Sequence, residues 1–161
     1  VTLVFAVLVA ISAFQTVTLQ ESAMEPTYSV GQKFFVNRAL YKIKSPKRGD
    51  VIVFKTSASD DAALHIRRVI GLPGETVQIK EGQIYINGNV YEENGAYQEI
   101  ADGGLADSAI TLESGEYFVL GDNRNNSEDS RFSDIGNISK KYIVGKIWFT
   151  VSPKSKIGFI R

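Results

Sequence analysis

The chain is built from short runs of β-branched and aromatic residues, separated by turn-forming glycine, proline and asparagine. The clearest runs are residues 33–37, 50–54, 116–120 and 143–150. Runs of this length with turn residues between them are typical of strands, and little of the sequence has the 3.6-residue periodicity of an amphipathic helix. We therefore predict a mainly β fold of coiled, barrel-like antiparallel sheets.

The strongest local signal is a hairpin at residues 84–91. Asn87-Gly88 stands between Ile84-Tyr85-Ile86 and Asn89-Val90-Tyr91, and Asn-Gly between two strand-like runs predicts a type I′ turn. The pattern is then lost over residues 93–111, where glycine and aspartate are frequent. We predict that this segment is an exposed loop insertion.

Composition excludes several classes of function. The 161 residues are enough for one domain with a real core. The 18 basic and 18 acidic residues give no field of one sign, so we do not expect a nucleic-acid partner. The absence of cysteine and the single histidine, His65, exclude a disulfide scaffold, a thiol nucleophile and multi-histidine metal sites. We predict no metal and no cofactor, and a packed or surface role for His65 rather than a catalytic one.

Residues 1–14 are almost wholly apolar, and no charge precedes Glu21. This segment is shorter than the roughly 20 residues that span a bilayer. We expect it to be the C-terminal part of a single-pass transmembrane anchor, with residues 15–161 forming an extracytoplasmic β domain at the cell membrane. A cleaved signal peptide, which would need a small-residue cleavage site, and a buried strand or helix are the alternatives.

Four segments carry a family resemblance: residues 22–27, 48–54, 67–75 and 121–131. In order and spacing they resemble the successive boxes of bacterial type I signal peptidases, and the resemblance extends to residues 144–146. It implies the signal peptidase fold. It also implies a membrane-anchored serine endopeptidase that removes signal peptides from exported preproteins, with signal peptides and membrane lipid as partners.

The resemblance also implies a Ser-Lys dyad, in which a serine hydroxyl attacks the scissile carbonyl and a neutral lysine takes its proton. The matching positions here are Ala23 and Arg67. Alanine has no nucleophile, and arginine stays protonated because its pKa is above about 12. Two residues before Ala23, where some members supply an oxyanion-hole hydroxyl, stands Glu21. A carboxylate there repels a developing oxyanion, so all three departures predict lost catalysis.

Other positions match the family's supporting residues. The position of Ser127 is one that hydrogen-bonds the catalytic lysine, and the positions of Asp129 and Arg131 are ones that form a salt bridge. Met24 and Pro26 match positions beside the substrate groove. The resemblance therefore predicts an intact support around a substituted dyad.

Ser22 is the hydroxyl adjacent to Ala23. In an extended segment neighbouring side chains point to opposite faces, so we expect Ser22 to point away from the site. It would also need a base, for which Lys33 and Lys55 are candidates by residue type alone. An apolar surface near the membrane is a further hypothesis, although a core role is the stronger expectation for each of its residues: Phe14, Leu19, Met24, Phe34 and Trp148.

Two functions remain in competition. The favoured hypothesis is a catalytically inactive, membrane-anchored member of the family that binds secreted or pilin-like preproteins as an assembly factor or chaperone. In this it resembles the dyad-lacking signal-peptidase-like proteins of some Gram-positive pilus loci. The alternative is a signal peptidase whose dyad residues have been mutated in this sequence or replaced by others. Self-cleaving repressors share a similar fold but carry a DNA-binding domain, in whose place this chain has an apolar segment.

Overall fold

The computed structural model describes residues 2–160, apart from the side chains of residues 9 and 11–14. The larger sheet contains β1 (Phe14–Thr18), β2 (Lys33–Asn37), β3 (Val51–Phe54), β4 (His65–Gly71), β9 (Glu116–Leu120), β10 (Ile138–Ser139), β11 (Ile143–Ser152) and β12 (Gly158–Phe159). The smaller sheet contains β5 (Thr76–Lys80), β6 (Gln83–Ile86), β7 (Asn89–Val90) and β8 (Ile110–Thr111). The helices are α1 (Thr2–Ala13) and α2 (Leu40–Ile43), with single 3₁₀ turns at η1 (Ser22–Met24), η2 (Gly104–Asp107), η3 (Lys140–Tyr142) and η4 (Lys154–Lys156).

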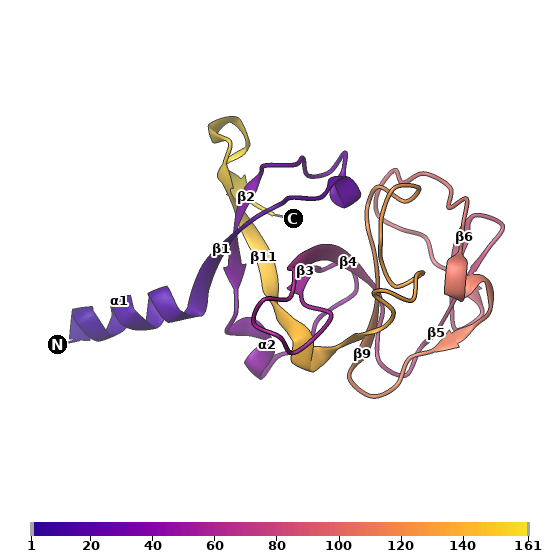
Figure 1. The fold of residues 1–161 in the computed structure, drawn as a ribbon, viewed down its shortest axis with the longest axis horizontal. Coiled ribbons are helices and arrows are strands. Elements are labelled where there is room, and N and C mark those ends of the chain that lie inside the picture. Colours follow the sequence, from indigo (N-terminus) through magenta and orange to yellow (C-terminus); the bar gives the residue numbers. More distant parts are fainter. Residues whose placement is uncertain (1, 161) are drawn as a thin grey trace.

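The predicted mainly β fold of antiparallel sheets is confirmed. The eight-stranded sheet runs in the order β1-β2-β11-β3-β4-β9-β10, with β12 paired to β11, and the four-stranded sheet runs β7-β6-β5-β8. The pairs within both sheets are antiparallel. In Figure 1, α1 projects from one end of the molecule, and β5 and β6 form the opposite end.

The predicted hairpin is also confirmed. β6 and β7 pair with Tyr85 opposite Val90 and Ile86 opposite Asn89. Asn87 and Gly88 connect the strands with φ of 51° and 81°. Positive φ at both central residues is what a type I′ turn requires. The local sequence alone was sufficient to define this element.

The apolar N-terminal segment forms α1, and the chain enters β1 at Phe14. Large side chains of α1, including Leu3 and Phe5, are exposed. In the described chain no helix has both the length and the apolar character needed to cross a membrane. The expected transmembrane helix is therefore not found there, since α1 has only 12 residues. Val1, the first residue of the predicted anchor, lies outside the described residues.

Residues 93–111 are largely irregular, as expected, but they are not wholly exposed. Ile100 and Ala106 are buried in the core of the smaller sheet, in one cluster with Ile79 of β5. The segment therefore covers one face of this sheet, because β5 and β6 have an apolar face that needs a partner.

The apolar residues that we considered for a membrane surface lie mostly in the core. Leu19, Met24 and Phe34 are buried together in the cluster beneath η1. Trp148 is only partly buried and stacks on Phe35 at a centroid distance of 6.3 Å. The side chain of Phe14 lies outside the described part of the chain. The core role, which was the stronger expectation, is confirmed for Leu19, Met24 and Phe34.

Candidate active site

Ala23 sits in the middle of η1, the single 3₁₀ turn that follows β1. The turn is closed by the Glu25 amide, which donates to the Ser22 carbonyl at 3.1 Å. We expected an extended segment here, and that expectation was wrong. The Ser22 hydroxyl instead accepts a hydrogen bond from the Asn126 side chain at 3.3 Å. Ser22 is therefore engaged by the loop at residues 121–131.

This loop holds the backbone of η1 in place. The Asn123 amide donates to the Ala23 carbonyl at 2.9 Å, and the Asn123 side chain donates to the Ser22 carbonyl at 3.1 Å. Gly121 makes the approach possible, because a Cβ at this position would collide with the Ser127 hydroxyl and the Ala23 carbonyl. The contact fixes the position of Ala23 relative to the loop.

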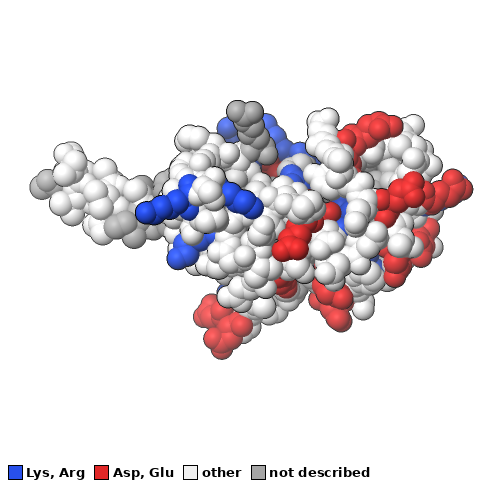
Figure 2. Space-filling model, turned by 90° about the horizontal axis from the view of Figure 1, so that it is seen from above, with Lys and Arg blue, Asp and Glu red and all other residues white. Residues whose placement is uncertain are grey.

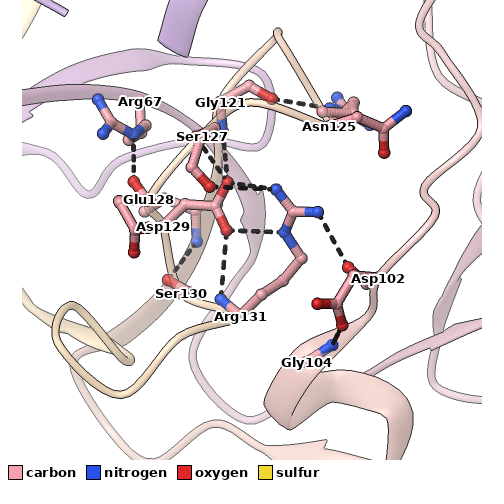
Figure 3. Close-up of polar contacts among 12 residues, drawn as sticks. Arg67, Asp102, Gly104, Gly121, Asn125, Ser127, Glu128, Asp129, Ser130 and Arg131 are labelled. Carbon is pink, nitrogen blue, oxygen red and sulfur yellow. Dashed lines mark hydrogen bonds and ion pairs between the residues drawn. The ribbon is translucent and has the colours of Figure 1, made fainter.

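Arg67 lies in β4 opposite Ile52 of β3, and its side chain is only 1% exposed. One guanidinium nitrogen donates to Glu21 at 2.7 Å and to the Ile66 carbonyl at 2.8 Å. The Nε atom donates to the Glu128 carbonyl at 2.7 Å, a contact drawn in Figure 3. The guanidinium is thus held by a carboxylate and by two backbone carbonyls.

Glu21 bridges Arg67 and His65. Its second carboxylate oxygen lies 3.2 Å from Nδ1 of His65, whose ring stacks on Phe54 at a centroid distance of 5.6 Å. Because a carboxylate only accepts hydrogen bonds, Nδ1 must be the donor. The hydrogen bond from His65, together with the charge and hydrogen bond of Arg67, outweighs desolvation and lowers the pKa of Glu21 to about 2. Glu21 is therefore ionised at neutral pH, and its charge is paired with that of Arg67.

Asp129 is the centre of a second polar cluster (Figure 3). Its carboxylate accepts two hydrogen bonds from the Arg131 guanidinium, at 2.8 and 2.9 Å. It also accepts from the Ser127 hydroxyl at 2.8 Å and from the Gly121 amide at 3.0 Å. Asp129 and Arg131 are 0% and 2% exposed, and they form the salt bridge that the resemblance implies. They fix the loop that contacts η1.

Ser127 does not make the contact that the resemblance implies. Its hydroxyl donates to Asp129, whereas Arg67 is bonded to the carbonyl of the neighbouring Glu128. The larger guanidinium therefore reaches the backbone of this loop. The resemblance predicted that Arg67 and Ser127 lie in one site, but it did not predict which of their atoms form hydrogen bonds.

Residues 1–152 match the family described as signal peptidase, peptidase S26. A probable signal peptidase I-2 of Synechocystis sp. is 31% identical, with 99% of this chain and 74% of that relative covered. The chain belongs to the signal peptidase I family. Signal peptidase I of Bacillus amyloliquefaciens is 36% identical, with 98% and 86% covered. A signal peptidase I of Enterococcus faecalis V583, known from a crystal structure, is 33% identical with a TM-score of 0.49, covering 65% of this chain and 97% of that chain.

Two further ion pairs join the segments that carry the signal peptidase resemblance. Arg48 binds both oxygens of Glu75 at 2.8 and 2.6 Å. Arg68 binds both oxygens of Asp122 at 2.8 and 2.6 Å. Sequence reasoning missed these pairs, although the opposite charges in the boxes were a signal for them. Paired guanidinium and carboxylate groups hold the strand ends of a signal peptidase fold in register around the site.

The remaining predicted site residues have mixed positions. Met24 is fully buried and packs in the core cluster that contains Leu19 and Phe34. Pro26, two residues further along the chain, is exposed. The Lys55 ammonium is bonded to the backbone carbonyls of Ser59 and Asp60, and Lys33 is exposed at the start of β2. Within residues 2–160, neither lysine is bonded to Ser22, and no group of three or more acidic, histidine or cysteine side chains is placed to hold a metal ion.

Proposed function

We propose that this signal peptidase-family protein binds the signal peptides of exported preproteins without cleaving them. The observation that carries the proposal is the ion pair of Arg67 and Glu21, 2.7 Å long, which stands beside Ala23. The resemblance assigns the nucleophile to position 23 and the base to position 67. In this chain those positions supply a methyl group and a permanently charged guanidinium.

Glu21 adds a second obstacle to the dyad reaction. A lysine acts as a base only when its amine is neutral, which requires a pKa far below the usual value of about 10.4. An ionised carboxylate within ion-pair distance stabilises the charged lysine and so raises that pKa. The same negative charge opposes the oxyanion of the tetrahedral intermediate. Restoring serine and lysine alone therefore leaves the site poorly suited to catalysis.

An extended peptide has a place to bind next to Ala23. Within the described residues, β1 is the outermost strand of the larger sheet and pairs only with β2. The chain passes from the end of β1 through residues 19–21 into η1. A peptide that adds to this open edge gains backbone hydrogen bonds and runs toward Ala23. We propose secreted or pilin-like precursors as ligands, with an assembly or chaperone role.

The membrane setting is part of the same proposal. The exposed apolar side chains of α1 suit an environment of lipid rather than water. We propose that α1 belongs to a single-pass anchor that holds the β domain on the extracytoplasmic side of the cell membrane. A preprotein leaving the membrane would then meet β1 directly.

The second candidate is a signal peptidase that cleaves preproteins, and the names of the relatives favour it. The relatives are described as signal peptidase I. Cleavage by this chain requires a nucleophile other than Ala23, and Ser22 is the adjacent hydroxyl. Ser22 is bonded to Asn126, and no lysine in the described residues is bonded to it.

The test uses a labelled preprotein peptide with an Ala-x-Ala site. Binding is measured by fluorescence anisotropy and cleavage by mass spectrometry. The variants are Ala23→Ser/Arg67→Lys, the same pair with Glu21→Ser, and the matched control Glu21→Ser/Arg67→Lys, which keeps Ala23. We expect the unmodified protein to bind without cutting, the triple variant to cut faster than the double variant, and the control to be inactive.

Cleavage by the unmodified protein would overturn the proposal and support the second candidate. In that case Ser22→Ala identifies the nucleophile if it abolishes cutting. Failure of the unmodified protein to bind the peptide would overturn the binding role. A double variant as fast as the triple variant would show that Glu21 does not hold the introduced lysine in its charged form.

A further inference from the structure

A hollow of about 990 Å³ lies beside α2, η3 and the loop that follows β3. We call it the basic hollow, because its lining contains five cationic side chains and no carboxylate: Arg38, Lys42, Lys55, Lys140 and Lys141. Apolar parts of Tyr142 and Val144 complete the wall. It lies on elements that do not include Ala23 or Arg67, so it is separate from the candidate active site.

The cations of the basic hollow have not been neutralised by the protein. In the described chain none of the five forms an ion pair with a carboxylate. Lys140 approaches the Ser45 hydroxyl at 3.5 Å, and the Lys141 ammonium lies 4.8 Å from the centre of the Tyr142 ring. Neither neighbour cancels a charge, so the hollow has an unbalanced positive potential.

The net charge of zero conceals a strong separation of charge along the molecule. Residues 72–115, which include the smaller sheet, contain Lys80 as their one basic residue and eight acidic residues: Glu75, Glu81, Glu92, Glu93, Glu99, Asp102, Asp107 and Glu113. The rest of the chain has a matching excess of basic residues. Figure 2 shows several red side chains at the end far from α1 and most of the blue ones in the nearer half, although red groups are also visible in the middle and at the lower edge of the nearer half. An anionic surface therefore attracts the α1 end of the domain and repels the other end.

The basic hollow and α1 lie at the same end of the larger sheet. Asn37, which precedes Arg38, pairs with Phe14, the residue that follows α1. The side chains of Leu3 and Phe5 in α1 are 78% and 70% exposed. An exposed apolar helix next to a set of unpaired cations has the two features that bind a bilayer surface, insertion of apolar groups and attraction to anionic headgroups.

We propose that the basic hollow binds the phosphate headgroups of anionic phospholipids, with phosphatidylglycerol as the representative lipid. Arg38 provides a planar guanidinium that suits two phosphate oxygens, and the lysines provide point charges around it. Each cation that reaches a membrane surface strengthens partition by roughly five-fold. The contact orients the domain with its acidic end away from the membrane, and it does not depend on signal-peptide binding.

The test compares two variants with the same loss of charge. The hollow variant is Arg38→Ser/Lys42→Ser/Lys140→Ser/Lys141→Ser; Lys55 is kept because it bonds to the backbone of its own loop. The control variant is Lys33→Ser/Lys80→Ser/Lys154→Ser/Lys156→Ser, in which each residue is exposed outside the basic hollow. Flotation with vesicles of phosphatidylcholine, with and without about one third phosphatidylglycerol, measures the preference for the anionic lipid. Circular dichroism checks that both variants are folded.

We expect the unmodified protein to prefer the phosphatidylglycerol vesicles. If at least two of its four removed cations contact the headgroups, at roughly five-fold each, the hollow variant should lose at least about 25-fold of this preference. The control variant should lose less than about five-fold. Equal losses in both variants, or no loss in the hollow variant, would overturn the proposal. Saturable binding of glycerol phosphate without any preference for the phosphatidylglycerol vesicles would also overturn it, because the hollow would then be a site for a soluble phosphate ester and not for a lipid headgroup.

Discussion

Arg131 and Arg67, two of the buried arginines of the described chain, have carboxylate partners in very different surroundings. Asp129, the partner of Arg131, is completely buried and accepts hydrogen bonds from Ser127 and a backbone amide as well. Glu21, the partner of Arg67, has 39% of its side chain exposed. The first pair is a closed support for a loop, whereas the second is open to solvent and to any ligand beside Ala23.

This difference shows which part of the signal peptidase framework has been kept. The closed pair and the loop around it fix η1, and they are present with their partners. The open pair stands where the resemblance expects a neutral lysine. The proposed binding role rests on this contrast between the two pairs. The following predictions test the contrast between the two pairs.

The largest effect is expected from Arg131→Met. This change leaves the Asp129 charge buried without its partner, and breaking a buried pair in this way costs about 3–5 kcal/mol of the free energy of unfolding. Urea denaturation measures it. Arg48→Met is the control, because Arg48 and Glu75 are 24% and 17% exposed and water can replace the lost partner. A similar cost for both variants would show that burial does not set the strength of these pairs.

Arg67→Met should cost less, about 2 kcal/mol. The change removes donors from the Glu128 and Ile66 carbonyls, but the half-exposed Glu21 can be rehydrated. Urea denaturation of Arg67→Met and of Glu21→Gln/Arg67→Met gives the contribution of the Glu21 charge. A loss as large as that of Arg131→Met would remove the contrast between the open and the closed pair.

The contribution of Glu21 should depend on pH. Its pKa is lowered from 4.5 to about 2, chiefly by the His65 hydrogen bond and also by Arg67. A carboxyl with a lowered folded pKa stabilises the protein fully above its unfolded value and loses that contribution as the pH falls through the folded value. After allowance for solvent screening we expect about 1 kcal/mol.

The measurement compares the free energies of unfolding of the unmodified protein and Glu21→Gln between pH 7 and pH 2. The difference between the two proteins should be constant above pH 4.5 and should shrink as the pH falls toward 2. Asp61→Asn, at an exposed loop position, is the control. A difference that does not change across this range would show that Glu21 is not held by His65 and Arg67.

The smallest effect is expected from Ser127→Ala, about 1 kcal/mol. Asp129 loses one hydrogen bond but keeps those from Arg131 and the Gly121 amide. Thermal or urea unfolding measures the loss, with Ser133→Ala, at an exposed position, as the control. A loss of several kcal/mol would mean that Ser127 is the main support of the closed pair rather than an addition to it.

The sequence predicted the elements whose formation depends on neighbouring residues. The hairpin at residues 84–91 follows from Asn-Gly between two strand-like runs, and β2 and β9 follow from their own composition. The boxes also predicted that Ala23, Arg67 and the loop at residues 121–131 belong to one site, and in the structure this loop is bonded to the Ala23 carbonyl and to the Arg67 side chain. Motif order carried that information because the residues of each box are consecutive.

Other features depended on contacts between distant segments. Glu21 lies in the segment that leads into η1 and Arg67 lies in β4, and only the pairing of the sheet brings their charges together. Residues 93–111 have a loop composition, yet Ile100 and Ala106 are buried because the smaller sheet has an apolar face to cover. Local composition cannot reveal such partners.

By itself, therefore, the sequence determined the β character, the hairpin and the side chains present at positions 23 and 67, a methyl group and a guanidinium, since side-chain identity and local turn geometry fix these directly. The tertiary structure decided that Glu21 neutralises Arg67, that Ser127 supports Asp129, and that five cations gather in one hollow next to α1. Each of these depends on the distance between atoms far apart in the chain, and electrostatic energy is set by that distance and by burial.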